Sequence, residues 1–350
     1  MNRRLYIDVC AGEIRAVVTA DGRPERLLIR RQGDAAGQIL GARSIGRVRR
    51  LLKPAALAFV DIGAGPDAVL NLSAETPKLV EGQAVEVEVR TEARADRGAV
   101  LRLIGPAEGP PRLTSPAPGP AEVFASFAGG EPVTGAAARA AADLAQAEAL
   151  ERVFPLKGGG DISVEPTRAL TAIDVDLGER DGPTPKRASS AANLAALAEA
   201  ARVLRLKGLG GLVVIDLVGR AHNAPSLMAA ARSAFAPDNP GVSIAPIGRF
   251  GTLEISLTRR TRPLADTLGA GPPGSDGTLL SDASLAAELA RALEREGRAN
   301  RGARLVGLAA PAVVAAAAPL LGWLEDRYGA RFTLEPEPAR SRAAFEVRIR

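Results

Sequence analysis

Three aspartates stand at the ends of apolar segments, where their carboxylates could hold a metal ion. Asp174 and Asp176 lie in the segment TAIDVDLG, and Asp216 ends the apolar run LVVIDL. In an extended strand, residues 174 and 176 point to the same face. Two adjacent strands that each present a carboxylate at one edge form an oxygen-rich, negative pocket that suits Mg²⁺. Such an ion could activate water and stabilise the leaving oxygen in phosphodiester hydrolysis.

The same aspartates also have a simpler interpretation. They could cap the ends of strands or form ion pairs with Arg202 or Arg205. Asp216 ends a strand that is apolar enough to be buried on both sides, where an unpaired acid is costly. Because paired acids on strands are not a specific signal, the spacing alone leaves a metal site and structural ion pairs both open.

Few other residues offer a catalytic chemistry. Cys10 is the single cysteine, which excludes an internal disulfide and a cysteine zinc cluster and suits a reducing cytoplasm. His222 is the single histidine, and no nucleophile elbow accompanies it, so we interpret it as a surface residue.

The N-terminal segment lacks an apolar core, and the most apolar run, residues 308–321, is too short to span a bilayer. We expect a cytoplasmic protein without membrane association.

Arginine supplies nearly all of the positive charge. The chain has 350 residues and a net charge of +5, and only five of its 45 basic residues are lysines. Guanidinium groups make planar contacts to phosphate and stack on bases, which favours a polyanion as partner. A GC-rich coding sequence that specifies Arg in place of Lys explains the same composition. Aromatic residues make up only 3% of the chain, so Leu, Val, Ile and Ala must fill the core.

The first part of the chain predicts mainly strands. Residues 3–30 predict two strands and, after the Asp21–Gly22 turn, a third. From residue 39 to about 104, short strands alternate with turns, which is typical of a small all-β barrel. Residues 105–120 are rich in Pro and Gly and predict a linker, and residues 135–153 predict a helix.

The middle of the chain predicts an α/β layer. The segments DISVEP and ALTAIDVDLG are strand-like, and GLVVIDL is a fully apolar strand. Between them we expect a helix that is capped by Ser189 or Ser190 and ends at Gly208. Beyond a second linker at residues 268–277, alternating helices and strands predict a small α/β domain that closes the chain.

Three pieces of the chain carry a resemblance to a known family. They are GGDISVEPTRALTAIDVD, NLAALAEAARVLRLKGLGGLVVIDL and IGRFGTLEIS, all between Gly159 and Leu264. In order and spacing this stretch resembles the catalytic core of the RNase E/G family of bacterial endoribonucleases. In that family two aspartates and an asparagine bind the catalytic magnesium, and these positions fall on Asp174, Asp216 and Asp176. The resemblance thus implies a Mg²⁺-dependent endoribonuclease in which Asp174 and Asp216 are catalytic.

The segment GRVRRLLKPAALAFVDIGAGPDAVLNL resembles the OB-fold barrel of the same family, which implies single-stranded RNA as partner. Such barrels stack bases on exposed aromatic rings beside a basic groove. The resemblance assigns RNA binding to Phe59, as a stacking residue, and to Arg97 and Arg249. Val69 replaces a second aromatic residue. Without the resemblance, core packing would be the favoured interpretation of Phe59.

The chain also departs from the family pattern. Residues 105–155 replace a much longer stretch that completes an RNase H-like part and forms a pocket for a 5′-monophosphate, so we expect that sensor to be missing. No cysteine pair precedes the small domain, which excludes the family's zinc link and leaves open a homodimer formed without zinc. Gly219 replaces an acid and Leu257 replaces an Arg near the active site, and each change weakens the case for full activity.

Together these observations predict an α/β fold: an RNase H-like and DNase I-like catalytic core, an inserted OB-fold barrel and a small C-terminal α/β domain. The expected parts are residues 1–38 (N-terminal strands of the RNase H-like part), 39–105 (barrel), 106–155 (linker and helix), 156–265 (metal-binding domain), 266–277 (linker) and 278–350 (small domain). The expected function is Mg²⁺-dependent cleavage of single-stranded RNA, independent of a 5′-monophosphate. The alternative is a non-catalytic RNA-binding protein that keeps this fold.

Overall fold

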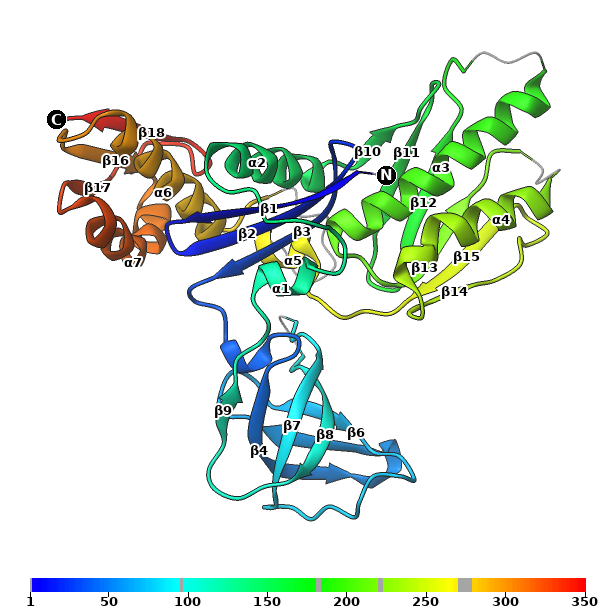
Figure 1. The fold of residues 1–350 in the computed structure, drawn as a ribbon, viewed down its shortest axis with the longest axis horizontal. Coiled ribbons are helices and arrows are strands. Elements are labelled where there is room, and N and C mark those ends of the chain that lie inside the picture. The colour runs from blue at the N-terminus through cyan, green and yellow to red at the C-terminus, as the bar shows by residue number, and fades with distance from the viewer. Residues whose placement is uncertain (1, 95–96, 181–183, 220–222, 270–278) are drawn as a thin grey trace.

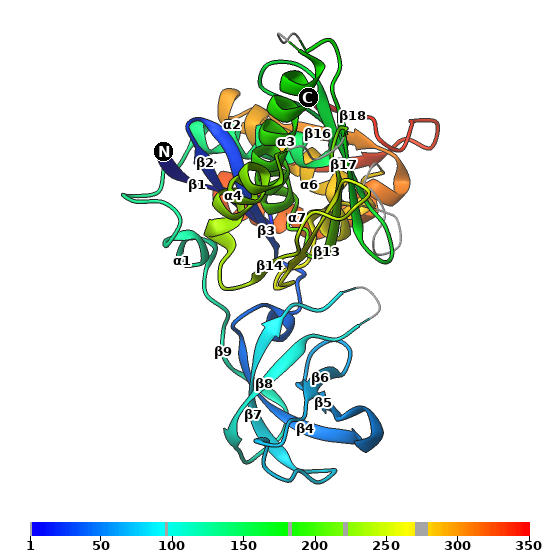
Figure 2. The same cartoon turned by 90° about the vertical axis from the view of Figure 1, so that its right-hand side faces the viewer.

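The computed structural model describes residues 2–94, 97–180, 184–219, 223–269 and 279–350, and His222 lies outside them. Four sheets with associated helices make up the described chain. The N-terminal sheet lies at the centre, a barrel projects from it, and two α/β units flank it (Figures 1 and 2). No described helix is both long and apolar enough to cross a membrane.

The N-terminal sheet is antiparallel, with β1 (Arg3–Cys10), β2 (Glu13–Ala20) and β3 (Arg23–Arg31) in sequence order. Asp21 and Gly22 both have positive φ, as a tight hairpin turn requires, so the predicted turn is confirmed. Alternation along β2 sends Val17 to the face under α2 (Ala136–Leu150) and Val18 to the face under α1 (Pro120–Phe124).

The predicted barrel is confirmed as a closed five-stranded sheet. Its strands are β4 (Arg43–Leu52), β5 (Leu57–Asp61), β6 (Ala68–Asn71), β7 (Ala84–Thr91) and β8 (Val100–Pro106), and the pairing of β4 with β5 closes it. The linker expected over residues 105–120 is partly wrong, because Arg112–Ser115 forms strand β9 against β4. Backbone groups at a strand edge need partners, and this pairing supplies them.

A second six-stranded sheet, here called the mixed sheet, has the order β10-β11-β12-β13-β15-β14. Its strands are β10 (Val153–Pro155), β11 (Asp161–Pro166), β12 (Thr171–Asp176), β13 (Gly211–Asp216), β14 (Val242–Ile244) and β15 (Thr252–Leu257). β12 and β13 are parallel, because α3 (Pro185–Lys207) connects them as a crossover. Helices α3 and α4 (Ala224–Phe235) pack on one face of the sheet (Figure 1).

Helix α3 begins earlier than its sequence suggested. The cap is Thr184, whose hydroxyl accepts a hydrogen bond from the backbone of Arg187 at 3.3 Å, and not Ser189 or Ser190. Pro185 occupies the first turn, where its missing N–H costs nothing. The predicted end is confirmed, because Gly208 closes the helix in the left-handed conformation with φ 66°.

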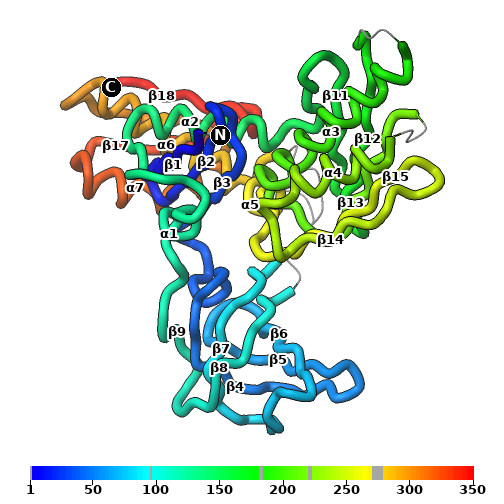
Figure 3. The backbone as a smooth tube through the Cα atoms, turned by 45° about the vertical axis from the view of Figure 1, so that its right-hand side comes forward, coloured from blue at the N-terminus to red at the C-terminus, as the bar shows by residue number. Residues whose placement is uncertain are grey.

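The C-terminal unit contains α6 (Asp282–Ala299), β16 (Leu305–Ala309), α7 (Pro311–Tyr328), β17 (Phe332–Pro336) and β18 (Phe345–Ile349). Its sheet has the order β17-β16-β18. The unit lies on the other side of the N-terminal sheet from the mixed sheet (Figure 3). Helix α5 (Leu264–Leu268) enters the region expected as a second linker, most of which, residues 270–278, lies outside the described chain.

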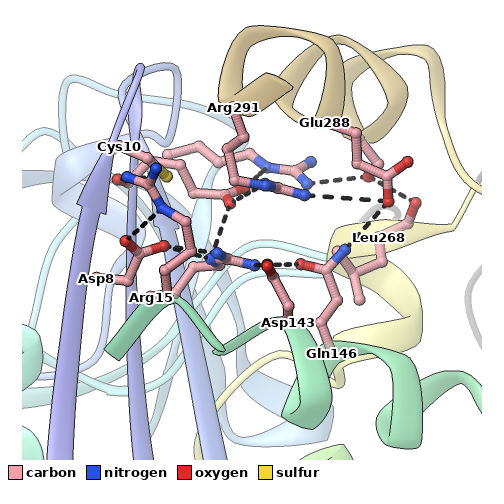
Figure 4. A network of polar contacts seen from close by, with 12 residues as sticks. Asp8, Cys10, Arg15, Asp143, Gln146, Leu268, Glu288 and Arg291 are labelled. Atoms are coloured by element: carbon pink, nitrogen blue, oxygen red, sulfur yellow. Dashed lines mark hydrogen bonds and ion pairs between the residues drawn. The ribbon is translucent and has the colours of Figure 1, made fainter. Parts of the chain in front are cut away.

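A buried ionic network joins this unit to the N-terminal sheet (Figure 4). Arg15 is fully buried, and its guanidinium contacts Asp8 at 2.5 Å and Asp143 of α2 at 2.7 Å. Arg291 of α6 contacts Glu13 at 2.7 Å. Cys10 lies beside this network, where burial, and then the charges of Glu13 and Asp8, raises the pKa of its thiol to about 12. Buried charges persist only when paired, so the network fixes how the elements dock.

Candidate active site

Asp174 and Asp216 are direct neighbours on the parallel strands β12 and β13. They are register partners, Asp216 as the last residue of β13 and Asp174 two residues before the end of β12. Neighbouring strands lie about 4.8 Å apart, and register partners point to the same face. The structure therefore places two carboxylates side by side at one edge of the mixed sheet.

The face that carries these aspartates is open. Ile173, Val175 and Ile215 alternate with them and are buried under α3 and α4, whereas Asp174 and Asp216 are exposed. Across the strands, the register partners on the open face are polar: Ser163 opposite Asp174, Asp161 opposite Asp176, and Thr252 opposite Asp216. The alternation of apolar and polar residues along each strand thus gives one core face and one face accessible to a large substrate.

Arg202 and Arg205, the two arginines considered as ion-pair partners of the aspartates, pair with other acids. Arg202 pairs with Glu199 at 2.5 Å and Glu148 at 2.6 Å. Arg205 pairs with Asp238 at 2.8 Å and Glu25 at 3.2 Å. Both arginines lie on α3, which covers the opposite face of the sheet, so the expectation that they neutralise the aspartates is wrong.

The described residues supply no basic partner for Asp174 or Asp216. Asp176 differs, because one of its oxygens accepts a hydrogen bond from the Gly178 backbone at 2.6 Å and closes the turn after β12. Two unpaired like charges on adjacent strands repel each other unless a cation lies between them. Their environment therefore favours cation binding over a structural role.

The donor set fits Mg²⁺. This ion is held by oxygen ligands, commonly one or two carboxylates, and completes its octahedron with water and substrate phosphates. Asp174 and Asp216 supply two such carboxylates on a face open to a phosphate-bearing substrate. Within the described chain, no cluster of three or more His, Cys, Asp or Glu side chains is arranged to hold a metal. The fit thus rests on the aspartate pair.

A cavity of about 550 Å³ lies next to the end of β13, since Val218 and Gly219 line it. Its other walls come from the first turns of α3 and α4 and include Lys186, Arg187, Ser189, Ser190 and Asn223. The side chains of Lys186 and Arg187 have no partner among the described residues, and backbone N–H groups are unsatisfied at the start of a helix. Positive charge therefore lines this cavity, beyond the end of β13 on the side of α3 and α4.

Asn193 positions the segment that follows Asp216, a role that our sequence reasoning missed. Its amide donates to the carbonyl of Val218 at 3.1 Å and accepts from the N–H of Val218 at 3.0 Å. It is 2% exposed and lies within the buried stripe of α3. A polar residue inside an apolar helical stripe is the signal that could have identified it.

Arg249 lies close to the aspartate pair in the loop between β14 and β15. The backbone of Leu217 donates to the carbonyl of Gly251 at 3.3 Å, which ties this loop to the end of β13. The neighbouring Phe250 is 78% exposed, and the guanidinium of Arg249 lies 4.6 Å from its ring centre. Phe250 was also missed, although an exposed ring in a chain with few aromatic residues is a notable feature.

Phe59 lies on the outside of the barrel. Ala58 and Val60 beside it on β5 are fully buried in the barrel core, whereas Phe59 is half-buried and points the other way. Its register neighbours are Arg50 on β4 and Val69 on β6. The expectation that Phe59 is a core residue of the barrel is therefore wrong, and its ring is available at the surface.

The barrel docks at the other end of the mixed sheet from the aspartate pair. The backbone N–H of Glu92, five residues before Arg97 in the chain, donates to the carbonyl of Arg260 at 2.8 Å. Arg260 lies just beyond the end of β15. That end of β15 pairs with Gly211, the first residue of β13, whereas Asp216 is the last. Five residues of strand span about 16 Å. The structure thus brings Arg249 near the aspartates but leaves Phe59 and Arg97 apart from them.

Comparisons with known proteins concern mainly the mixed sheet. Residues 137–261 match the model of the Ribonuclease E/G family, a range that includes the aspartate pair and Arg249 but not the barrel.

Similar curated proteins include Ribonuclease E of Haemophilus influenzae, 36% identical over 154 residues, and Ribonuclease E of Escherichia coli, 34% identical over 154 residues. The alignments cover 42% of this chain and 16% and 14% of those proteins. The Ribonuclease E/G-like protein of Arabidopsis thaliana chloroplasts is 33% identical over 119 residues, which is 33% of this chain and 12% of that protein. On this evidence, the segment that builds the mixed sheet is similar to the ribonuclease E/G family.

Proposed function

We propose that this protein is a Mg²⁺-dependent endoribonuclease that hydrolyses single-stranded RNA. The observation that carries the proposal is the pair Asp174–Asp216, which has no basic partner among the described residues and lies on an open face within the segment that matches the family. The names of the similar proteins indicate a ribonuclease, and the aspartate pair supplies the chemistry that such an enzyme needs.

Each group of the site has a role in this proposal. Asp174 and Asp216 would hold the ion, and bound Mg²⁺ would supply a Lewis acid that activates water and stabilises the leaving oxygen. Asp176 would assist while its hydrogen bond to Gly178 keeps the turn closed. Lys186 and Arg187, in the cavity beyond the end of β13, offer charge to another backbone phosphate of the RNA.

The RNA would contact both ends of the mixed sheet. Arg249 and Phe250 form a cation-and-ring surface beside the aspartates, on which a base can stack. Phe59 and Arg97 would bind the strand farther along, on the barrel. Following the resemblance, we assign β1–β3 with α2 to a shortened RNase H-like part and the mixed sheet to a DNase I-like part.

Incubation of labelled, unstructured A/U-rich RNA with Mg²⁺ or with EDTA tests the proposal. Discrete fragments that appear only with Mg²⁺ are the expected result. The alternative is a non-catalytic RNA-binding protein, which is favoured by Gly219 and Leu257 at positions where the family has charged residues. A salt-sensitive shift of the RNA without fragments would establish that alternative.

We predict that cleavage does not depend on a 5′-monophosphate. Residues 105–155 contain little beyond β9, α1 and α2, and α1 and α2 pack on the N-terminal sheet, so we assign no separate sensor subdomain to this stretch. Initial rates on 5′-phosphorylated and 5′-hydroxyl forms of one RNA should be equal. A tenfold advantage for the phosphorylated form, equivalent to about 1.4 kcal/mol, would contradict the prediction.

We predict that Phe59→Ala weakens RNA binding and leaves cleavage at saturating RNA unchanged. One stacked base contributes about 1–3 kcal/mol, and Phe59 lies away from the aspartate pair. Fluorescence anisotropy and single-turnover cleavage would measure the two effects. Leu113→Ala is the matched control, because Leu113 is an exposed apolar residue on β9 of the same barrel. Equal loss of affinity in both variants would speak against stacking on Phe59.

A further inference from the structure

A cavity of about 450 Å³ lies where the N-terminal sheet, the end of α3 and the segment after β15 meet. Four arginines line this seam cavity: Arg26, Arg205, Arg259 and Arg260. Among the described residues that line it, Asp238 is the one acid. The cavity therefore carries an excess of positive charge.

Among the described residues, carboxylates pair with two of these arginines, Arg26 and Arg205. Arg26 and Arg205 share Asp238, at 3.4 Å and 2.8 Å, and Arg205 also pairs with Glu25. Even so, the buried Nε of Arg205 has no hydrogen-bond partner within the described chain. Burial lowers the pKa of Arg26, and the neighbouring charge of Arg205 lowers it further.

Arg259 is held in place without a carboxylate. Its Nε donates to the carbonyl of Gly210 at 2.8 Å. Its guanidinium lies so close over Gly211 that any Cβ at that position would collide with it, and Gly211 has φ +95°, which an L side chain rarely adopts. The two glycines thus provide the space that the guanidinium of Arg259 occupies at the wall of the seam cavity.

The acids nearest to this seam are already paired with other bases. Glu92 contacts Arg30 at 2.7 Å, and Asp34 contacts Arg262 at 3.0 Å. In the part of the chain that the structure describes, no carboxylate pairs with the side chains of Arg94, Arg259 or Arg260.

The barrel adds positive charge to the same place. Burial lowers the pKa of Arg259, and the charges of Arg94 and Arg97 on the barrel lower it further. The hydroxyl of Thr91 donates to the carbonyl of Arg259 at 3.1 Å, which keeps the barrel strand against this segment. Arg94 and Arg259 have no carboxylate partner among the described residues, and such clustered positive charge attracts an anion.

We propose that the seam cavity binds a phosphate group through Arg259, with Arg94 and Arg260 beside it. The guanidinium fork suits two phosphate oxygens. The phosphate belongs either to an RNA strand that passes from the barrel to the mixed sheet, a source that rests on the proposed function, or to a free nucleotide. Both sources present the same chemistry to the arginines.

The test measures binding in EDTA, so that no RNA is cleaved. Labelled oligouridylate is titrated by anisotropy, and AMP and inorganic phosphate are titrated by calorimetry. Arg259→Gln should weaken the binding of phosphate ligands about tenfold and lower the salt slope for RNA by about 0.7, the loss of one phosphate contact. Arg259→Lys should recover part of the affinity, because the charge remains.

Two further variants keep the test decisive. Arg94→Gln removes a side chain that forms no hydrogen bond or ion pair with the described residues, so it should weaken binding without unfolding the protein. Arg304→Gln, which removes an exposed arginine of the C-terminal unit, should change nothing. Wild-type affinity in Arg259→Gln and Arg94→Gln, or an equal loss in Arg304→Gln, overturns the proposed site.

The two ligands separate this proposal from the proposed function. Arg259-dependent binding of AMP or phosphate with no binding of RNA would retain the site, identify a free nucleotide or phosphate as its ligand, and contradict the ribonuclease proposal. RNA binding that is unaffected by Arg259→Gln would retain the ribonuclease proposal and reject the site. Binding of neither ligand by the wild-type protein rejects both.

Discussion

Replacement of Asp216 by Asn is expected to abolish cleavage of single-stranded RNA while stability and RNA affinity stay near wild type. The change is isosteric, and Asp216 is exposed without a base partner in the described structure, so folding loses no ion pair. It removes one of two adjacent carboxylates that would hold Mg²⁺. We expect single-turnover cleavage to fall at least a hundredfold, about 2.7 kcal/mol of transition-state stabilisation.

Two companion variants sharpen this prediction. Glu254→Gln is the matched control, because Glu254 is an exposed acid on the same open face of the mixed sheet, on β15. It should cleave at the wild-type rate. Asp174→Asn should be as inactive as Asp216→Asn, and the double variant no worse than either, because both residues serve one site. Fragments from Asp216→Asn at the wild-type rate would remove the basis of the active-site assignment.

Replacement of Arg15 by Met is expected to lower the free energy of unfolding by about 3 kcal/mol. Arg15 is 0% exposed and contacts Asp8 at 2.5 Å (Figure 4) and Glu13 at 3.8 Å, and both acids are 3% exposed. Removal of one partner from a buried ion pair leaves an uncompensated charge, which costs about 3–5 kcal/mol. The lower end of this energy range applies here, because in the variant Asp8 would still pair with Arg139 and Glu13 would still pair with Arg291.

Urea unfolding, followed by circular dichroism, measures this effect. Arg152→Met is the control, because Arg152 pairs with Glu165 at 3.0 Å on the surface, with both side chains about half exposed. Surface pairs contribute about 0–1 kcal/mol, so the control should be nearly neutral. If Arg15→Met were as stable as the control, the network would not hold the C-terminal unit to the N-terminal sheet.

Much of the local structure follows from the sequence alone. The alternation in TAIDVD and the apolar run GLVVID predict two strands, and the helix between them predicts a parallel crossover. A parallel pair brings the ends of both strands to one edge, which is where Asp174 and Asp216 meet. The short strands and turns of residues 39–104 likewise predict the barrel, because strand length and turn spacing are local properties.

What the sequence could not determine depends on contacts between distant residues. The periodicity of α3 shows that one side is apolar, but the partners of Arg202 and Arg205 come from β3, α2 and the turn after α4. Residues 112–115 look like a linker because their pairing partner, β4, lies some seventy residues earlier.

The position of the barrel is the clearest example. Sequence patterns predict Phe59 and Arg97 on the barrel and the aspartates on the mixed sheet, but backbone hydrogen bonds between residues near 92 and 260 decide which end of the sheet the barrel meets. That docking gathers Arg94 and Arg259 and separates Phe59 from the aspartate pair. The sequence by itself determined the strands, the helices and the acids on one edge. Only the tertiary structure decided which face is open and which charges lack partners, because both depend on elements that pack together from far apart in the chain.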